Sequence, residues 1–280
     1  MARASDPVEP CKSAGETRAR TQPLGKAAPY GSLRAGLTSY GRDFAPIVVT
    51  MLVYFWLRGQ APLGNPQRAV DTTVRLVDFE KAIGVFREPD LQAATLHWEW
   101  TKELANYVYS YLHFPALAGV VTWIWIRDRA LFRTVRNTLY CSMVIGLFFY
   151  YVFPAAPPRL MALYGHNYGF VDTVFGGGTS VRYPQPGIFE NDYAAIPSFH
   201  FGWMALVAVA LWTVSQNPLP RLIALFLVVI MVWASAATAN HLFVDMAIGG
   251  IVMLAAWWIS RSIAHHLRRS NPSGLPRTPS

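Results

Sequence analysis

Two stretches of sequence decide how this chain folds: NDYAAIPSFHFGW at residues 191–203 and SAATANHLFVD at residues 235–245. Each places a histidine, His200 or His241, beside a hydrophobic run of membrane length, and Asp245 follows His241 by four residues. On a helix that spacing places both side chains on one face, one turn apart. An aspartate at the head of the apolar run VDMAIGGIVMLAAWWI is costly to expose to lipid. We therefore expect Asp245 to face the protein interior, with His241 as its partner.

The composition is that of an integral membrane protein. Of the 280 residues, 53% are hydrophobic and only 14% are charged, which is too apolar for an ordinary soluble domain. The formal net charge of +8 would suggest nucleic acid if the basic residues formed a patch on a folded domain, but they concentrate in the two tails and one short loop. We therefore expect the lipid bilayer, and not nucleic acid, as the partner of this chain.

The hydrophobic runs predict an all-α integral membrane protein, a bundle of six transmembrane helices with one interfacial amphipathic helix. The runs cover residues 44–57, extended back toward 37, and then 104–126, 137–153, 201–215, 222–237 and 244–259. Residues 65–100 are amphipathic instead, because valines recur at helical spacing opposite charged residues, and Pro89 divides this segment in two. We expect this segment to lie in the headgroup region or over the mouth of the bundle.

The basic residues predict how the chain is oriented. Residues 1–43 form a predicted disordered tail, 44–262 the membrane catalytic domain and 263–280 a basic tail. Four arginines also crowd a predicted loop after the second span: Arg127, Arg129, Arg133 and Arg136. Because basic loops stay in the cytoplasm, both tails are expected to be cytoplasmic in a multi-pass protein of the cell membrane. The long loop at 155–199 is then extracytoplasmic, and Arg159, His200, His241 and Asp245 share that face.

A polar stripe on the second predicted span should face inward. Asn106, Ser110 and His113 are spaced at i, i+4 and i+7, on one side of a helix. Either hydrogen bonding between helices or substrate binding would explain the stripe.

Two histidines, an aspartate and an arginine at a membrane surface fit phosphoryl transfer from a lipid phosphate. One imidazole can attack phosphorus and form a phosphohistidine, while an aspartate one turn away fixes its tautomer. The second histidine can protonate the departing lipid oxygen, then take a proton from water or an alcohol. We expect Arg159 to bind phosphate oxygens, together with Ser198 and the backbone at a helix N-terminus. This chemistry needs no metal and no cofactor.

At these residues the chain resembles a known family. IPSFH at 196–200 and NHLFVD at 240–245 resemble the second and third motifs of the type 2 phosphatidic acid phosphatase (PAP2) superfamily. FPAAPPR at 153–159 and the NHxxxD form of the last motif resemble its inositolphosphorylceramide synthase branch. The resemblance covers roughly residues 60–262 and implies a six-helix membrane domain with metal-independent lipid phosphatase or phosphotransferase activity. It implies the following roles: His241 as nucleophile, Asp245 as its orienter, His200 as general acid, and Arg159 and Ser198 on the phosphate.

The chain departs from the family pattern at two places. The wider family has an arginine six residues before the nucleophile, where this chain has Ser235. The first motif of the wider family, a lysine and an Arg-Pro pair, is represented here only by the Pro-Pro-Arg segment that ends at Arg159. Arg182 is a candidate substitute for binding the substrate.

Several functions compete with a lipid phosphatase or phosphotransferase. Neither the lipid nor the acceptor can be read from a motif, so transfer of an inositol-phosphate type of headgroup remains the alternative to hydrolysis. A serine hydrolase could use Ser198, His241 and Asp245, but no Gly-x-Ser-x-Gly elbow surrounds Ser198. A metal-dependent hydrolase could recruit Asp192 or Glu190, but no His-Glu-x-x-His motif is present. A non-enzymatic transporter could bind a lipid headgroup in the same cavity.

Overall fold

The computed structural model describes residues 33–61, 66–174, 179–181 and 187–270, and this part of the chain is helical. The first helices are α1 (Leu33–Gly59), α2 (Pro66–Ala82), α3 (Glu88–Leu96), α4 (Glu99–Tyr111), α5 (His113–Arg127) and α6 (Arg129–Val152). Two 3-10 helices, η1 (Pro158–Tyr164) and η2 (Gly187–Phe189), precede α7 (Phe199–Val214), α8 (Pro218–Ala237) and α9 (Phe243–Ser270). The all-α prediction is confirmed for the described residues.

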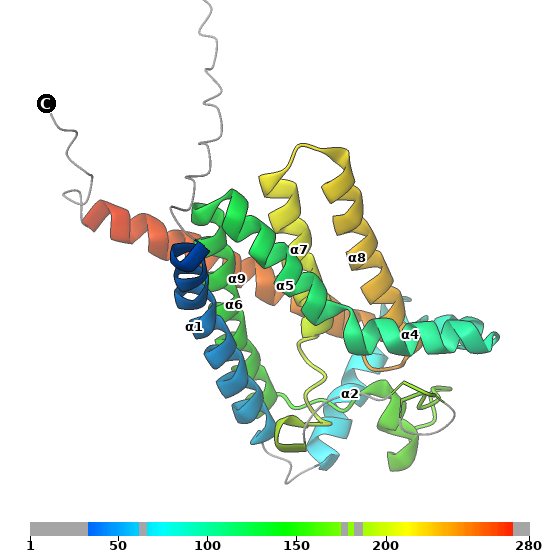
Figure 1. Cartoon of the computed structure of the whole chain (residues 1–280). Helices are drawn as coiled ribbons and strands as arrows, with labels where there is room; N and C mark the ends of the chain where they lie inside the picture. Colours follow the sequence, from blue (N-terminus) through cyan, green and yellow to red (C-terminus); the bar gives the residue numbers. More distant parts are fainter. Residues whose placement is uncertain (1–32, 62–65, 175–178, 182–186, 271–280) are drawn as a thin grey trace, which may run out of the picture.

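The long helices run up and down alongside one another (Figure 1). The α5–α6 junction and the α7–α8 turn lie at the end of the bundle where α1 begins. The other end carries α2, η1, the segment that leads into α7 and the corner between α8 and α9. α7 lies at the centre, because it packs against α5, α6, α8 and α9.

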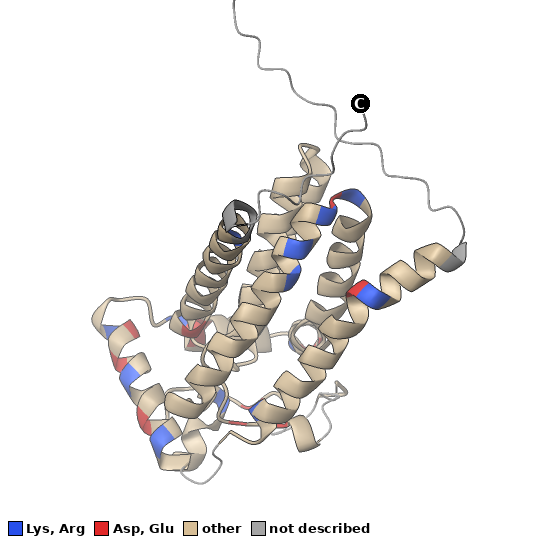
Figure 2. Cartoon of the chain, turned by 90° about the vertical axis from the view of Figure 1, so that its left-hand side faces the viewer, with Lys and Arg blue, Asp and Glu red and all other residues tan. Residues whose placement is uncertain are grey.

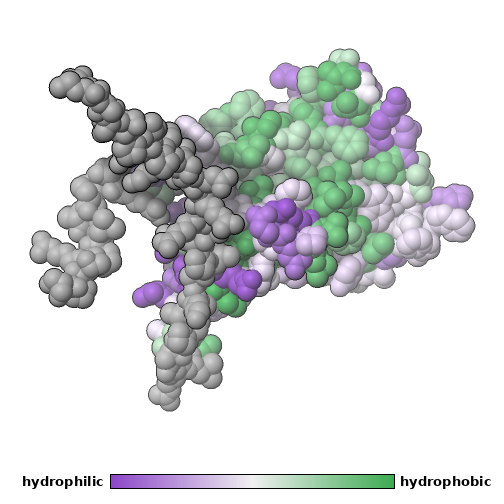
Figure 3. Space-filling model, turned by 90° about the horizontal axis from the view of Figure 1, so that it is seen from above, coloured by the Kyte–Doolittle hydropathy of each residue, from purple (hydrophilic) through white to green (hydrophobic). Residues whose placement is uncertain are grey.

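Apolar side chains fill the interior of the bundle and also cover its outside. The buried core includes Ile124, Phe132, Met143, Met204 and Met231. Large hydrophobic residues are exposed on several helices, among them Leu52, Trp56, Val144, Phe148, Leu225, Phe226, Leu254 and Trp258. Figure 3, which views the bundle from above, shows hydrophobic side chains over much of the face turned to the viewer. Acidic and basic residues are sparse along the middle of the helices and gather at their ends and on α2 (Figure 2).

Two helices of the described chain are long and apolar enough to cross a membrane, namely α8 over Pro218–Ala237 and α9 over Phe243–His266. α7 is apolar but shorter. Of the six predicted spans, these two therefore have the helix length and the apolar composition that a membrane crossing needs. The others fall short for local reasons: arginines occupy the first turns of α6, and α5 is cut short at its beginning.

The predicted span at 104–126 is wrong as a single helix. The chain forms α4 and α5 instead, which change direction at Leu112 (Figure 1). Pro115 explains the break, because a proline inside a helix has no N–H to donate and its ring clashes with the carbonyl four residues earlier, here that of Tyr111. The break brings His113 to the first turn of α5, and it leaves α4 across the end of the bundle.

The predicted arginine-rich loop at 127–136 is also wrong, because a single residue separates α5 from α6. Oδ1 of Asp128 accepts hydrogen bonds from the backbone N–H groups of Ala130 (2.8 Å) and Leu131 (2.9 Å). This side chain therefore caps α6 and starts the helix at Arg129. Arg133 and Arg136 lie on the helix itself.

Two predicted boundaries shift because helices extend into the tails. Residues 33–43, assigned to a disordered tail, form the first turns of α1. Oδ2 of Asp43 holds these turns in place by accepting from Nε1 of Trp125 (2.8 Å) and Nη1 of Arg129 (2.9 Å). At the other end α9 continues to Ser270, past the predicted boundary at 262. The rest of the two tails lies outside the described residues.

The amphipathic segment forms two helices, as predicted. Val70 and Val77 of α2 are fully buried, whereas Asp71, Arg75 and Asp78 are exposed on its opposite side. Pro89 lies in the first turn of α3, where proline is tolerated. Both helices lie at the end of the bundle that holds the α8–α9 corner, where His241 is located.

Candidate active site

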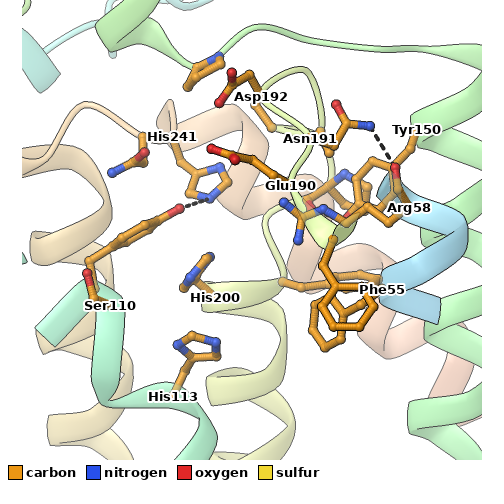
Figure 4. A pocket seen from close by; sticks show the side chains of 18 of the residues that line it. Phe55, Arg58, Ser110, His113, Tyr150, Glu190, Asn191, Asp192, His200 and His241 are labelled. Atoms are coloured by element: carbon orange, nitrogen blue, oxygen red, sulfur yellow. Dashed lines mark hydrogen bonds between the residues drawn. The ribbon is translucent and has the colours of Figure 1, made fainter. Parts of the chain in front are cut away.

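A cavity of about 280 Å³ opens at this end of the bundle. Its walls come from α1, α4, α5, α6, α7 and the segments before α7 and α9. Figure 4 shows His241, His200 and His113 one above another along one side, with Arg58 and Phe55 across from them. Among the residues described, no group of three His, Cys, Asp or Glu side chains is arranged to hold a metal ion.

His241 and Asp245 lie next to each other, although only Asp245 is on α9 and His241 lies in the turn before that helix. Nδ1 of His241 lies 3.8 Å from Oδ2 of Asp245, an ion-pair distance that is longer than a hydrogen bond. The same carboxylate oxygen accepts from the backbone N–H of Leu242 (2.9 Å). Both side chains are almost fully buried. Because Nδ1 faces the carboxylate, Nε2 is the ring nitrogen that faces the cavity, where it lies 3.3 Å from Oη of Tyr109.

His200 lies next to His241 on the neighbouring helix. The centroids of the two rings are 5.6 Å apart. Tyr109 joins them, because its ring stacks on His200 at 4.0 Å while its hydroxyl reaches His241. His113 continues the column below, with its ring 4.4 Å from that of His200. The structure therefore brings together the two predicted histidines and their aspartate.

The polar stripe on the second predicted span divides into two parts. Ser110 and His113 line the cavity, whereas Asn106 exchanges hydrogen bonds with Thr173, whose hydroxyl donates to Oδ1 of Asn106 over 3.1 Å. All three members of the stripe are buried, as expected. Tyr109 lies on the same face, three residues after Asn106 and four before His113. The helical spacing alone could therefore have identified it.

Arg159 lines the cavity, but acidic and amide partners surround its guanidinium. Nε donates to Oδ1 of Asn240 (3.0 Å), Nη1 donates to Oδ2 of Asp172 (3.1 Å), and Nη2 lies 3.6 Å from Oδ1 of Asp192. The backbone N–H of Arg159 also donates to the carbonyl of Ala239 (2.8 Å). Arg159 thus ties the long loop to the turn that carries His241, and two carboxylates balance its charge.

Ser198 holds the start of α7 against the start of α9 rather than lining the cavity. Its side chain is fully buried, and its backbone N–H donates to the carbonyl of Asp245 (3.1 Å). Gly249 permits this approach, because a Cβ at that position would lie 2.3 Å from the carbonyl oxygen of Ser198. The Oγ that we expected to contact phosphate has no hydrogen-bond partner and is not on the cavity wall.

Ser235 stands where the wider family has an arginine, and Arg182 was the candidate substitute. Arg182 lies outside the described residues. Ser235 is fully buried at the end of α8, and its carbonyl accepts the backbone N–H groups of Asn240 (3.1 Å) and His241 (3.3 Å). Ser235 shapes the turn before His241 and adds no positive charge to the cavity.

Two carboxylates of the amphipathic segment, which sequence reasoning missed, fix the start of α9. Glu80 accepts from the backbone N–H of Val244 (2.6 Å), and Glu88 accepts from that of Phe243 (2.6 Å). Both side chains are fully buried. We call this pair the carboxylate clamp. It satisfies N–H groups that a helix start leaves without partners, so it fixes the backbone just after His241.

The clamp also sets the ionisation of Glu80. Burial and the neighbouring Glu88 raise the pKa of Glu80 from 4.5 to about 9, so Glu80 is protonated at neutral pH.

Gln92 of α3 holds the other side of the corner between α8 and α9. Its Nε2 donates to the carbonyl of Ala237 (3.1 Å), the last residue of α8. α2 and α3 therefore hold both sides of the corner in which His241 lies.

Comparisons with known proteins agree with this geometry. Residues 74–259 match the model of the PAP2 superfamily. Among curated proteins, the chain is similar to "Phosphoinositol dihydroceramide synthase" of Bacteroides thetaiotaomicron, with 27% identity over 206 residues. That alignment covers 65% of this chain and 65% of the length of the curated relative. No solved structure matches the chain. Because the family match extends over more than half of the residues and includes both histidines and Asp245, the chain belongs to the PAP2 superfamily.

Proposed function

We propose that this protein is an integral membrane enzyme that transfers a phosphoryl or phosphate-linked group from a lipid through a covalent phosphohistidine on His241, without a metal. The observation that carries the proposal is one cavity in which Nε2 of His241 faces the interior, Nδ1 faces Asp245, and the His200 ring lies 5.6 Å away. Family membership supports the lipid phosphatase or phosphotransferase class.

The proposed reaction has two displacements at phosphorus. In the first, the lone pair on Nε2 of His241 attacks phosphorus, the bond from phosphorus to the lipid oxygen breaks, and protonated His200 gives its proton to that oxygen. Asp245 stabilises the imidazolium that forms. In the second, neutral His200 takes a proton from water or an alcohol, the oxygen attacks phosphorus, and the bond to Nε2 breaks. Both histidines return to their starting states.

The arrangement of the helices supports a membrane-spanning position with the cavity on the extracytoplasmic side. α1, α5, α6, α7, α8 and α9 would be the six crossings, and the exposed apolar side chains on their flanks would face lipid. Arg127 ends α5, and Arg129, Arg133 and Arg136 lie in the first turns of α6, next to the junction that Figure 1 shows at the end of the bundle away from the cavity. The preference for basic residues on the inside favours a cytoplasmic position for that end. Both tails would then be cytoplasmic as well.

Transfer to an alcohol is the second candidate, and the name of the curated relative favours it. That protein is called a phosphoinositol dihydroceramide synthase, which describes attachment of a headgroup rather than hydrolysis. Water and an alcohol would use the same pair of histidines, because either acceptor gives a proton to His200 and attacks the same intermediate. An assay that contains both water and an alcohol acceptor would therefore show which of them receives the phosphoryl group.

The test is an assay of purified protein in the presence of a chelator, with a panel of lipid phosphates and phosphoinositol lipids. Free phosphate would indicate hydrolysis, and a new phosphodiester in the presence of polyol or ceramide acceptors would indicate transfer. His241→Asn and His200→Asn should each abolish turnover, whereas His97→Asn, an exposed histidine outside the cavity, should not. Turnover that persists in His241→Asn, or turnover that the chelator abolishes, would contradict the proposal. Lipid transport without turnover would identify a transporter.

A further inference from the structure

The cavity has a second guanidinium, which comes from a helix outside the residues matched by the family model. Arg58 lies in the last turn of α1, whereas the family match begins at residue 74. Its side chain lines the same cavity as Arg159, His200 and His241. Figure 4 shows it directed into the cavity between Glu190 and Phe55.

Several contacts fix the end of α1 over the cavity. Nδ2 of Asn191 donates to the carbonyl of Arg58 (2.8 Å), and the hydroxyl of Tyr151 donates to the carbonyl of Leu57 (2.9 Å). Gly59 allows η2 to pack closely, because a Cβ there would lie 2.3 Å from the carbonyl oxygen of Ile188. The backbone that carries Arg58 is therefore held by α6 and by the segment before α7, which also forms part of the cavity wall.

Carboxylates outnumber the guanidinium of Arg159 around the cavity. Asp172 and Asp192 already face the guanidinium of Arg159, and Glu190 adds another carboxylate to the wall. A phosphate group that entered a cavity with this balance would meet more negative than positive charge if Arg159 were its only cationic partner. Arg58 adds a second guanidinium beside the same cavity, which reduces this excess of negative charge from two to one.

We propose that Arg58 binds the phosphate group of the substrate, so that the phosphate lies between Arg58 and the pair of histidines. The inference rests on the proposed function. A guanidinium suits this role because its planar fork can donate two parallel hydrogen bonds to phosphate oxygens. α1 then has a part in substrate binding as well as in packing. Arg159 lines the same cavity and positions the turn at Asn240.

The experiment measures binding of inorganic phosphate and of vanadate to purified protein by titration calorimetry, beside kinetics with a lipid phosphate. Arg58→Gln should weaken phosphate binding by about 10- to 100-fold, the usual effect of losing a charged hydrogen-bond donor. Arg58→Lys should recover part of the binding, because it keeps the charge without the fork. Arg75→Gln, an exposed arginine on α2, should bind phosphate as the unmodified protein does.

His241→Asn separates this inference from the proposed function. It should lose turnover but still bind phosphate. If His241→Asn stays active, the proposed function fails, whatever Arg58 does. If His241→Asn is inactive while Arg58→Gln binds phosphate normally, this inference alone fails. Should Arg58→Gln not fold, as judged by its unfolding temperature without ligand, Arg58→Lys decides: affinity equal to that of the unmodified protein would overturn the inference.

Discussion

Glu80 accepts a hydrogen bond over 2.6 Å from the backbone N–H of Val244, three residues beyond His241. Glu88 likewise accepts from the backbone N–H of the preceding residue, Phe243. The position of the proposed nucleophile therefore depends on α2 and α3, although these helices contribute no side chain to the cavity wall. α2 and α3 therefore help to position the site from outside the cavity. Several predictions about activity and stability arise from this and related contacts.

The protonation of Glu80 predicts a loss of stability at alkaline pH. Burial and Glu88 raise its pKa from 4.5 to about 9 in the folded protein. The folded state keeps a proton that the unfolded chain releases, so this contribution is fully present below about pH 4.5 and is lost as pH rises through 9. The unfolding temperature should fall across that window. Glu80→Gln, which keeps a neutral side chain, should flatten the fall, and an unchanged pH profile would contradict this assignment.

Removing Glu88 should reduce turnover more than substrate binding. Glu88→Ala leaves the N–H of Phe243 buried without a partner, which costs about 1–3 kcal/mol and lets the start of α9 shift. Because His241 would move while Arg58 and Arg159 stay, we expect kcat to fall with little change in KM. Asp90→Ala, on the exposed side of the same helix, is the matched control. A defect in KM alone would argue against a role of Glu88 in positioning.

Tyr109 makes two contacts that two substitutions can separate. Tyr109→Phe removes the hydroxyl 3.3 Å from Nε2 of His241 but keeps the ring on His200, so kcat should fall by only about 2- to 10-fold. Tyr109→Ala removes both contacts and should reduce kcat further. Tyr107→Phe, on the exposed side of α4, should have no effect. Equal losses in the Phe and Ala variants would show that stacking on His200 does not matter.

The close approach of α7 and α9 predicts that Gly249 accepts no larger residue. Gly249→Ala places a Cβ 2.3 Å from the carbonyl oxygen of Ser198, so the helices must separate, and overpacking of this kind costs about 1–3 kcal/mol. Because α7 carries His200 and α9 carries Asp245, both the unfolding temperature and kcat should fall. Gly119→Ala, where the added Cβ meets nothing within 4 Å, should change neither.

The sequence predicts the parts of this protein that depend on local chemistry. The separation of four residues between His241 and Asp245 predicted that they pair, and the structure places the two side chains together, with His241 in the turn before α9 rather than on a helix. The amphipathic pattern of α2 also appears in the structure, because it reflects which side of one helix is buried. Hydrophobicity alone predicted one helix at residues 104–126, which is wrong because Pro115 interrupts the apolar run and divides it between α4 and α5.

The missed residues act through contacts between segments that lie far apart in the chain. The hydrogen bond between Glu80 and Val244 spans 164 positions, and no periodicity within α2 reveals it. Arg58 directly follows the first predicted hydrophobic run at 44–57, and it lines a cavity that only the other helices complete. The sequence likewise predicted a phosphate contact for Ser198, but the approach of α9 buries that side chain instead.

The most direct test of the account is to trap the covalent intermediate. Purified protein is mixed with a labelled phosphate ester that has a good leaving group, quenched in alkali within milliseconds, and the modified peptide is mapped by mass spectrometry. We predict an alkali-stable, acid-labile phosphate on His241, which accumulates in His200→Asn because the second step lacks its base, and which is absent in His241→Asn. Turnover without any modification of His241, or a label on Ser198, would contradict the account.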